Sequence, residues 1–248
     1  MKKLVTTIIC IVALFSCSED GSSISTDGSS DGDGQGGSLA VFALKGDYLY
    51  AVDQRELSVF NISDTKKPVE VNSVFIGFDI ETLFSYKDFL YIGSQTGMFI
   101  YDIKNPELPE RLASVSHFRA CDPVIANDTH AYVTLNSDAV GCGGSINQLE
   151  TYKLDDIKNP VLLNTRNLKA PKGLGFYQNY LLVCDDEIKI FDITDPENSK
   201  LVTSIPENAF DLIVRDNLLI AIGDKALYQY ELNPSDIEDI KKLSTISI

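Results

Sequence analysis

The 248-residue sequence contains no tryptophan, only two histidines and two methionines, and few basic side chains. Its 21 Lys and Arg residues are outnumbered by 36 Asp and Glu residues, which gives a formal net charge of −15. A surface of this sign repels nucleic acid and anionic lipid headgroups, so we expect no nucleic-acid partner. No window keeps apolar residues three and four positions apart over the length of a helix, which argues against a helical fold.

The motifs of common catalytic and metal sites are also absent. The sequence has no Gly-x-Ser-x-Gly, His-Glu-x-x-His or Gly-x-x-x-x-Gly-Lys-[Ser/Thr] pattern. No Cys-x-x-Cys or His-x-x-x-His spacing supports a zinc site. The acidic run at 31–34 lacks the spaced ligands and the final Glu of an EF-hand. We therefore predict no metal, no cofactor and no catalytic activity.

Five short apolar runs each end in an aromatic residue, any residue, and then Ile or Leu. The aromatic residues follow one another at spacings of 41, 51, 39 and 39 positions. A period of roughly forty residues indicates one supersecondary unit copied in tandem. The five triplets lie at 60–62, 101–103, 152–154, 191–193 and 230–232.

A second marker precedes each triplet, by 10, 10, 20, 9 and 10 residues in turn, so the third unit carries about ten extra residues. In the second unit, apolar runs at 83–84, 89–92, 98–101 and 111–115 are separated by turn residues, which predicts four strands. The one helix-like stretch, 234–240, is long enough for one or two turns. The five markers are Tyr50, Tyr91, Tyr132, Leu182 and Ile220.

Five units of four antiparallel strands predict an all-β protein, a β-propeller of about five blades. An open or partial propeller is the alternative, since no strand is left over to complete a neighbouring blade. A solenoid would need a shorter period for each coil. WD40 repeats share the period, but the absence of tryptophan removes their Trp-Asp signature.

The segments YLYAVDQRELSVFNISDTKKPVEV, FLYIGSQTGMFIYDIKNPELPERL and YLLVCDDEIKIFDITDPENSKLV resemble the LVIVD repeat. The resemblance extends over 39–248 and is clearest in the second and fourth units. The third and fifth units depart from it, with Tyr-Lys-Leu-Asp-Asp and Tyr-Glu-Leu-Asn-Pro after their last strand-forming run. It implies a propeller of the kind found in bacterial and archaeal surface proteins.

Residues 1–16 have the form of a lipoprotein signal peptide, with two lysines, an apolar run and a small residue before Cys17. An ordinary secretory signal is the alternative. We expect Cys17 to be lipidated, residues 17–38 to form a flexible Ser/Gly/Asp tether, and residues 39–248 to form the propeller. The protein would then be anchored to a membrane in a bacterial cell envelope, at the outer membrane or cell surface. The acidic residues 18–20 resemble the surface-export signal of Bacteroidetes lipoproteins.

Three cysteines remain in the propeller. Cys121 precedes the first strand of the third unit, and Cys142 lies in the long connection between its second and third strands. Both connections lie at the same end of the blade, so we predict a Cys121–Cys142 disulfide, with two free thiols as the alternative. Closing this loop would contribute on the order of 3 kcal/mol. Cys184 ends a predicted strand and is expected to be a buried apolar residue.

The connections between blades and the long connections within them converge on one end of a propeller, where ligands bind in a concave site. Polar and aromatic residues predicted at this end form the candidate ligand face. These charges could instead pair with one another and cap the channel, and an acid/base pair of His117 and Asp122 is a further alternative. The face comprises Phe78, Asp79, Glu81, His117, Arg119, Asp122, Lys172, Asn208 and Asp211.

Together these patterns predict a surface-anchored lipoprotein whose non-catalytic propeller binds a protein or a glycan. One alternative is a propeller hydrolase or lyase acting on envelope or extracellular polysaccharide. Another is a structural subunit of an envelope complex.

Overall fold

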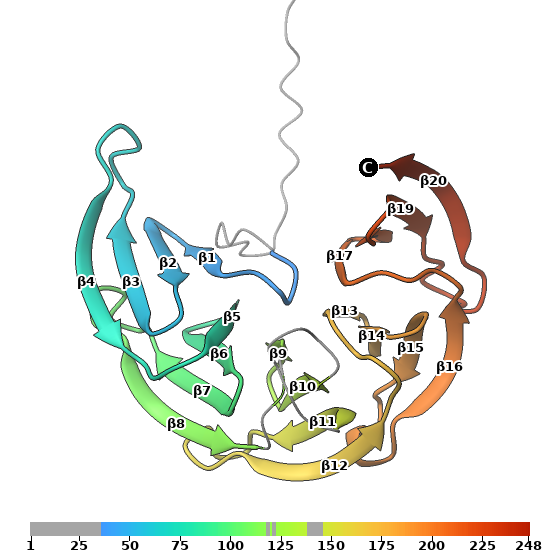
Figure 1. Ribbon diagram of the computed structural model, residues 1–248, viewed down its shortest axis with the longest axis horizontal. Coiled ribbons are helices and arrows are strands. Elements are labelled where there is room, and N and C mark those ends of the chain that lie inside the picture. Colours follow the sequence, from blue (N-terminus) through green and yellow to red (C-terminus); the bar gives the residue numbers. More distant parts are fainter. Residues whose placement is uncertain (1–35, 118–119, 121–122, 138–145) are drawn as a thin grey trace, which may run out of the picture. The chain divides into compact units, whose positions relative to one another are not determined.

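The computed structural model describes residues 36–117, 120, 123–137 and 146–248. Their strands form five sheets, each made of four consecutive strands that pair antiparallel with their neighbours. Figure 1 shows the sheets following one another around a common centre, with the first strand of each innermost and the fourth outermost. The expected all-β fold of five four-stranded antiparallel units is therefore confirmed.

The sheets are numbered one to five in chain order. Sheet one contains β1 (Phe42–Lys45), β2 (Tyr48–Val52), β3 (Glu56–Asn61) and β4 (Val69–Phe75). Sheet two contains β5 (Ile80–Tyr86), β6 (Phe89–Ser94), β7 (Gly97–Asp102) and β8 (Glu110–Ser116). Sheet three contains β9 (Val124–Ala126), β10 (His130–Asn136), β11 (Asn147–Lys153) and β12 (Val161–Asn167). Sheet four contains β13 (Leu174–Tyr177), β14 (Tyr180–Cys184), β15 (Ile188–Asp192) and β16 (Lys200–Ile205). Sheet five contains β17 (Asp211–Arg215), β18 (Leu218–Ile222), β19 (Ala226–Glu231) and β20 (Lys241–Ser247).

The first two strands of four sheets are joined by two-residue hairpin loops. The first loop residue is left-handed in each, with φ between 51° and 53°, at Gly46, Lys87, Gln178 and Asp216. Such loops need positive φ to match the twist of the flanking strands. Sheet three departs from this pattern, because three residues, 127–129, join β9 to β10.

The repeated triplet has a structural role in every sheet. Between the third and fourth strands, the register shifts at the triplet aromatic residue in all five sheets, so each outer strand carries a bulge there. The N–H of the last triplet residue then donates to a carbonyl in the loop between the first two strands, at 2.8–2.9 Å in all five sheets. The triplet therefore ends one strand and ties it to the loop beside it.

The marker residues form the contact from each sheet to the next. Tyr50, Tyr91, Tyr132 and Leu182 are at most 1% exposed. Each packs in an apolar cluster that extends into the following sheet. Ile220, in the fifth sheet, is only half-buried.

In sheet one, two positions that are buried in the other sheets are partly exposed. Leu49 and Phe60 are half-buried, whereas the residues at their positions in the other sheets, such as Leu90 and Phe191, are at most 5% exposed. Within the described residues no strand of sheet one pairs with a strand of sheet five, and Figure 1 shows a gap between these sheets. The sheets are not closed into a ring, which agrees with the open or partial propeller given as the alternative.

Residues 37–41 bridge the centre of the sheets. The carbonyl of Ala40 accepts a hydrogen bond from Leu83 in sheet two at 2.7 Å. At the other end, Ser38 is buried and accepts a bond from the N–H of Leu174 in sheet four at 2.7 Å. Gly37 and Ser38, which the sequence analysis places in the tether, thus lie within the folded part of the chain.

The helix-like stretch at 234–240 is a pair of turns, so that expectation was wrong. Asn233 Oδ1 accepts the N–H of Ser235 at 2.9 Å, and Asp236 Oδ1 accepts the N–H of Glu238 at 3.1 Å. These local bonds from short polar side chains compete with a helix for the same backbone donors. A short helix, η1 (Pro196–Asn198), is found instead in the connection between β15 and β16 of sheet four.

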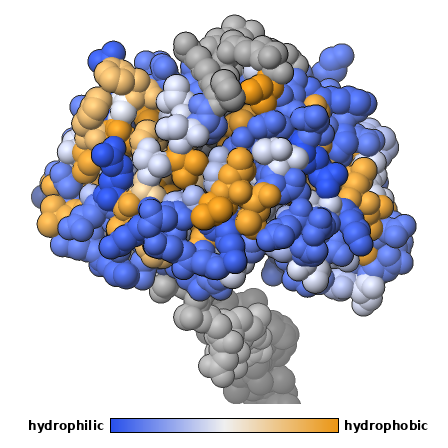
Figure 2. Space-filling model, turned by 90° about the horizontal axis from the view of Figure 1, so that it is seen from below, coloured by the Kyte–Doolittle hydropathy of each residue, from blue (hydrophilic) through white to orange (hydrophobic). Residues whose placement is uncertain are grey.

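The rim of the sheets is mainly polar. Val161, Leu162 and Leu201 are large apolar residues that remain exposed on its outer strands. Figure 2 faces the rim near β8, β12 and β16 and shows apolar areas separated by polar ones. Scattered surface residues of this kind are normal in soluble proteins.

Candidate functional site

A cavity lies between sheets two and three on the side of the predicted ligand face. Its volume is about 400 Å³, and it is lined by Ser116, His117, Glu150, Tyr152 and Leu162. Ser116 and His117 come from the end of β8, while the other three residues come from β11 and β12. Of the predicted ligand-face residues, His117 is the one that the structure places in this cavity.

Glu150 is the most unusual residue of this cavity. It is 5% exposed. Its carboxylate accepts bonds from Gln148 Nε2 at 2.8 Å and from the Tyr152 hydroxyl at 2.5 Å. Both donors are neutral, and none of the ion pairs in the described part of the chain involves Glu150. Among the described residues the donors to this buried carboxylate are neutral, which favours a ligand that brings a hydrogen-bond donor or a positive charge.

The sequence analysis missed Glu150. It stands two residues before a triplet aromatic, where the other sheets carry Ser58, Phe99, Lys189 and Tyr228. The sequence did contain a signal for Glu150: it is a charged residue at a strand position that faces the preceding sheet. Lys189, the other charged residue at this position, has internal partners of opposite charge.

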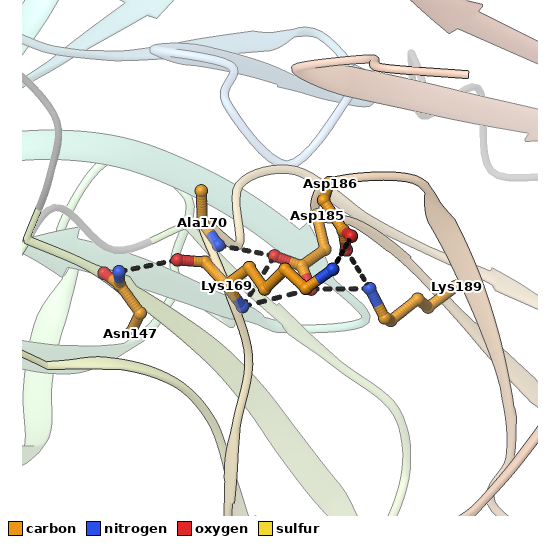
Figure 3. A network of polar contacts seen from close by, with 6 residues as sticks. All are labelled: Asn147, Lys169, Ala170, Asp185, Asp186 and Lys189. Atoms are coloured by element: carbon orange, nitrogen blue, oxygen red, sulfur yellow. Dashed lines mark hydrogen bonds and ion pairs between the residues drawn. The ribbon is translucent and has the colours of Figure 1, made fainter. Parts of the chain in front are cut away.

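Lys189 belongs to a polar network around the hairpin between β14 and β15 (Figure 3). Its Nζ contacts Asp185, whose side chain is completely buried, at 2.7 Å, and it also pairs with Asp186. Asp185 accepts the N–H groups of Lys169 and Ala170 as well. The bonds from Lys169 and Lys189 hold the pKa of Asp186 well below its usual range. These charges satisfy one another, so this part of the face has a structural role.

The same network reaches the third sheet. Asn147 Nδ2 donates to the carbonyl of Lys169 at 2.6 Å, and Asn147 Oδ1 accepts the N–H of Ser137 at 3.1 Å. Asn147 begins β11, directly after the insertion of the third unit, and Ser137 follows β10. The two ends of the insertion are therefore bonded to each other and to sheet four.

Asp211 lies at the centre of the sheets, where its carboxylate meets the bridging residues 37–41. Oδ1 accepts a bond from the Ser38 hydroxyl at 3.3 Å, and Oδ2 accepts the N–H of Leu39 at 3.4 Å. A Cβ on Gly37 would stand 2.1 Å from a carboxylate oxygen. A Cβ on Gly173 would stand 2.3 Å from the other oxygen and 2.9 Å from the Phe210 carbonyl, so this position requires glycine. Burial raises the pKa of Asp211. Its described partners are internal and neutral, so they give this carboxylate a structural role.

The other predicted residues fall into separate groups. Asp79 and Glu81 both contact Gln95, through the Asp79 carbonyl at 3.0 Å and the Glu81 carboxylate at 2.9 Å. Phe78 is 60% exposed and lies under the guanidinium of Arg55.

Lys172 and Asn208 are the remaining described members of the predicted face. Lys172 is fixed through its backbone, since its N–H donates to Cys184 and its carbonyl accepts a bond from Thr134. Asn208 is exposed. Of the described members of the predicted face, His117 lines the cavity and Asp211 meets the bridging residues.

Several predictions lie outside the described residues: Cys17 with its signal peptide, Arg119, Asp122, and the Cys121–Cys142 disulfide. Cys184 is described as a free and completely buried thiol, and burial raises its pKa. Among the residues that the structure covers, no three His, Cys, Asp or Glu side chains are grouped to hold a metal ion. The same residues include no helix with the length and apolar character of a membrane span.

The family model described as LVIVD repeat matches residues 36–75, which are the first unit and the glycines before it. The chain therefore contains an LVIVD repeat, as the sequence comparison indicated. No curated protein matches the chain in sequence.

Solved structures share the fold at low sequence identity. A Lactobacillus plantarum protein superposes with a TM-score of 0.68 at 9% identity, covering 82% of this chain and 69% of that one. Kluyveromyces lactis Hsv2 gives 0.53 at 10% identity, covering 82% and 60%. BamB from Moraxella catarrhalis gives 0.55 at 10% identity, covering 72% and 53%. The chain spans less than two thirds of Hsv2 and BamB, and these likenesses establish its β-propeller fold.

Proposed function

We propose that this LVIVD-repeat propeller is a lipoprotein of a bacterial cell envelope that binds a protein or a glycan without catalysis. The anchor would be the acylated Cys17, which follows a basic, then apolar, signal sequence. A Ser/Gly/Asp-rich stretch follows Cys17 and would let the propeller reach its partner at the outer membrane or cell surface.

The observation that supports binding is the cavity of about 400 Å³ around Glu150 and His117. Its volume lies within the usual range of ligand pockets, and it combines an apolar wall with a few converging polar groups. It also lies beside the third unit, the one unit whose length differs from the others. Propeller folds carry many unrelated functions, so the proposal rests on this site rather than on the fold.

The hydrolase or lyase alternative has no comparable support. It places His117, Asp122 and Arg119 together, and Asp122 and Arg119 lie outside the described residues. Among the described residues, the carboxylate in the cavity is bonded to Gln148 and Tyr152.

Two experiments test the proposal. Growth with a labelled fatty acid should label the wild-type chain and leave a Cys17→Ser variant unlabelled; equal labelling would exclude the anchor. For binding, the full chain is applied to a glycan array and to a display library of peptides. Glu150→Gln should weaken a partner that occupies this cavity by about tenfold or more, because a charged acceptor is lost.

The matched control is Glu110→Gln, which changes an exposed carboxylate at the start of β8. Binding that is the same in the wild type, Glu150→Gln and Glu110→Gln would exclude this cavity as the site. Turnover of a polysaccharide that is lost in His117→Ala would replace the non-catalytic proposal with the enzyme alternative.

A further inference from the structure

The hydroxyl of Tyr132 is an unpaired polar group inside the protein. Tyr132 lies in β10 and is completely buried. Its Oη is buried and has no hydrogen-bond partner in the described part of the chain. A buried hydroxyl without a partner loses its bonds to water and gains nothing in return, so native structures contain few of them.

The repeat shows what this hydroxyl lacks. Tyr50 holds the same position in sheet one, and its hydroxyl donates to the carbonyl of Pro106 in the next sheet at 2.9 Å. Pro106 stands five residues after a triplet aromatic, and the corresponding residue opposite Tyr132 is Pro196. At Tyr132 this bond is not made, and a cavity lies between the tyrosine and Pro196 instead.

The space beside the marker tyrosine increases from sheet one to sheet three. Tyr50 is bonded across the sheet boundary, as described. Tyr91, in the second sheet, faces a cavity of about 50 Å³ beside Ile157, the residue that replaces proline there. At Tyr132 the cavity reaches about 330 Å³, which is within the range of ligand pockets. The longer loop at 127–129 contributes to its wall.

The wall of this cavity is polar but carries no charge. Side-chain amides, including those of Gln178 and Asn179, and threonine hydroxyls, including that of Thr194, provide donors and acceptors. Ile193 and Pro196 add apolar surface. Among the lining residues that the structure describes, none is Lys, Arg, Asp or Glu. Lys153, Asp155 and Glu197 act on His130 from outside this lining, and a neutral ligand matches the residues that form the wall.

His130 completes the wall as a neutral group. Burial, and then the charge of Lys153, lower its pKa, so the imidazole is uncharged near pH 7. Its Nδ1 lies 2.8 Å from the hydroxyl of Thr129. A neutral imidazole offers one donor and one acceptor.

We infer that this cavity binds a neutral carbohydrate, with the Tyr132 hydroxyl completing its hydrogen bonds on the sugar. Sugar hydroxyls both donate and accept, which matches the mixture of amides, hydroxyls and imidazole on the wall. The apolar C–H face of a sugar ring fits against Ile193 and Pro196. The site is separate from the cavity at Glu150, because sheet two contributes to the wall of the Glu150 cavity, whereas sheet four contributes to the wall of this one.

The test uses the full chain and the methyl glycosides of glucose, galactose, mannose and N-acetylglucosamine, with glucuronate as a charged comparison. Saturation-transfer NMR and calorimetry should detect at least one neutral glycoside and no preference for glucuronate. Tyr132→Phe should weaken that binding by about tenfold or more. The matched control, Tyr50→Phe, removes the equivalent hydroxyl and should leave the affinity unchanged.

A stability measurement separates binding from folding. Without sugar, Tyr132→Phe should melt at the same temperature as the wild type or higher, because it removes an unpaired buried hydroxyl. The inference is overturned if no glycoside binds, if Tyr132→Phe binds as well as the wild type, or if it melts lower. Glu150→Gln should not change glycoside binding, so failure here is distinguishable from failure of the proposed function.

Discussion

The hydroxyl of Ser38 donates a hydrogen bond to Oδ1 of Asp211 at 3.3 Å, although the two residues are 173 positions apart in the chain. The same hydroxyl accepts the N–H of Leu174 at 2.7 Å. The segment that precedes the first sheet is thereby held by the fourth and the fifth. The bond between Ser38 and Asp211 therefore connects the two ends of the row of sheets, sheet one and sheet five, whose strands do not pair with each other.

Replacing Ser38 with alanine should lower the free energy of unfolding by about 1–3 kcal/mol, because the buried N–H of Leu174 loses its acceptor. Urea denaturation followed by circular dichroism measures this change. Ser73→Ala is the control, since Ser73 is exposed and bonds only to Glu56 at the surface. That variant should stay within about 0.5 kcal/mol of the wild type. Equal effects in the two variants would show that the central contact contributes nothing.

Asp211 should make stability depend on pH. Burial raises its pKa in the folded protein above the unfolded value. The stability linked to its protonated form is therefore fully present below the unfolded pKa and is lost as pH rises through the folded pKa. We expect the wild type to lose stability relative to Asp211→Asn between acidic and neutral pH.

Comparing these two proteins removes the contribution of other carboxylates, including Asp186 and Asp192, whose pKa values are lowered and which act in the opposite direction. Chemical denaturation at several pH values provides the measurement. A difference between the two proteins that does not vary with pH would contradict the expected titration.

Asp185→Ala should be strongly destabilising. It leaves two backbone N–H groups without their buried acceptor, and it leaves the ammonium of Lys189, which is 14% exposed, with Asp186 in place of two carboxylates. Removing one partner of a buried ion pair costs about 3–5 kcal/mol. The comparison is Asp155→Ala, which breaks the exposed pair with Lys153 and should cost less than about 1 kcal/mol. Similar midpoints of thermal unfolding for the two variants would refute a structural role of the network.

Tyr50→Phe should lower the free energy of unfolding by about 1–2 kcal/mol, because the carbonyl of Pro106 loses a hydrogen bond between the first two sheets. Tyr48→Phe should have a smaller effect. Its partner is the carboxylate of Glu107, which remains accessible to water. Urea titrations of both variants give the comparison, and the prediction fails if Tyr48→Phe is the more damaging change.

The strand order was predictable because each sheet repeats the same markers and turns. Tyr50 and Phe60 mark the same strands in sheet one that Tyr91 and Tyr101 mark in sheet two, and the alternation between them has the period of a strand. The unusual third unit was also visible, as ten extra residues. The bulge at each triplet was not, because a register shift depends on pairing across two strands.

The site residues were less accessible to sequence reasoning. Ser38 stands in a Ser/Gly/Asp-rich stretch, and only its long-range contact with Asp211 shows that it belongs to the fold. Glu150 is of a residue type usually found at the surface, yet it is only 5% exposed. Tyr132 and Tyr50 are identical in the repeat pattern. They differ only in whether the next sheet supplies an acceptor, which no local pattern contains.

The bulges of the outer strands bear on how the molecule behaves beside its own copies. Each of the five sheets ends in an outer strand whose free donors and acceptors could pair with a strand of another molecule. A bulge interrupts the regular spacing of those groups and increases the local twist. The residue left unpaired is apolar in every sheet: Val71, Leu112, Leu163, Val202 and Leu243. The repeat thus carries its own protection against edge-to-edge aggregation, renewed once in each unit.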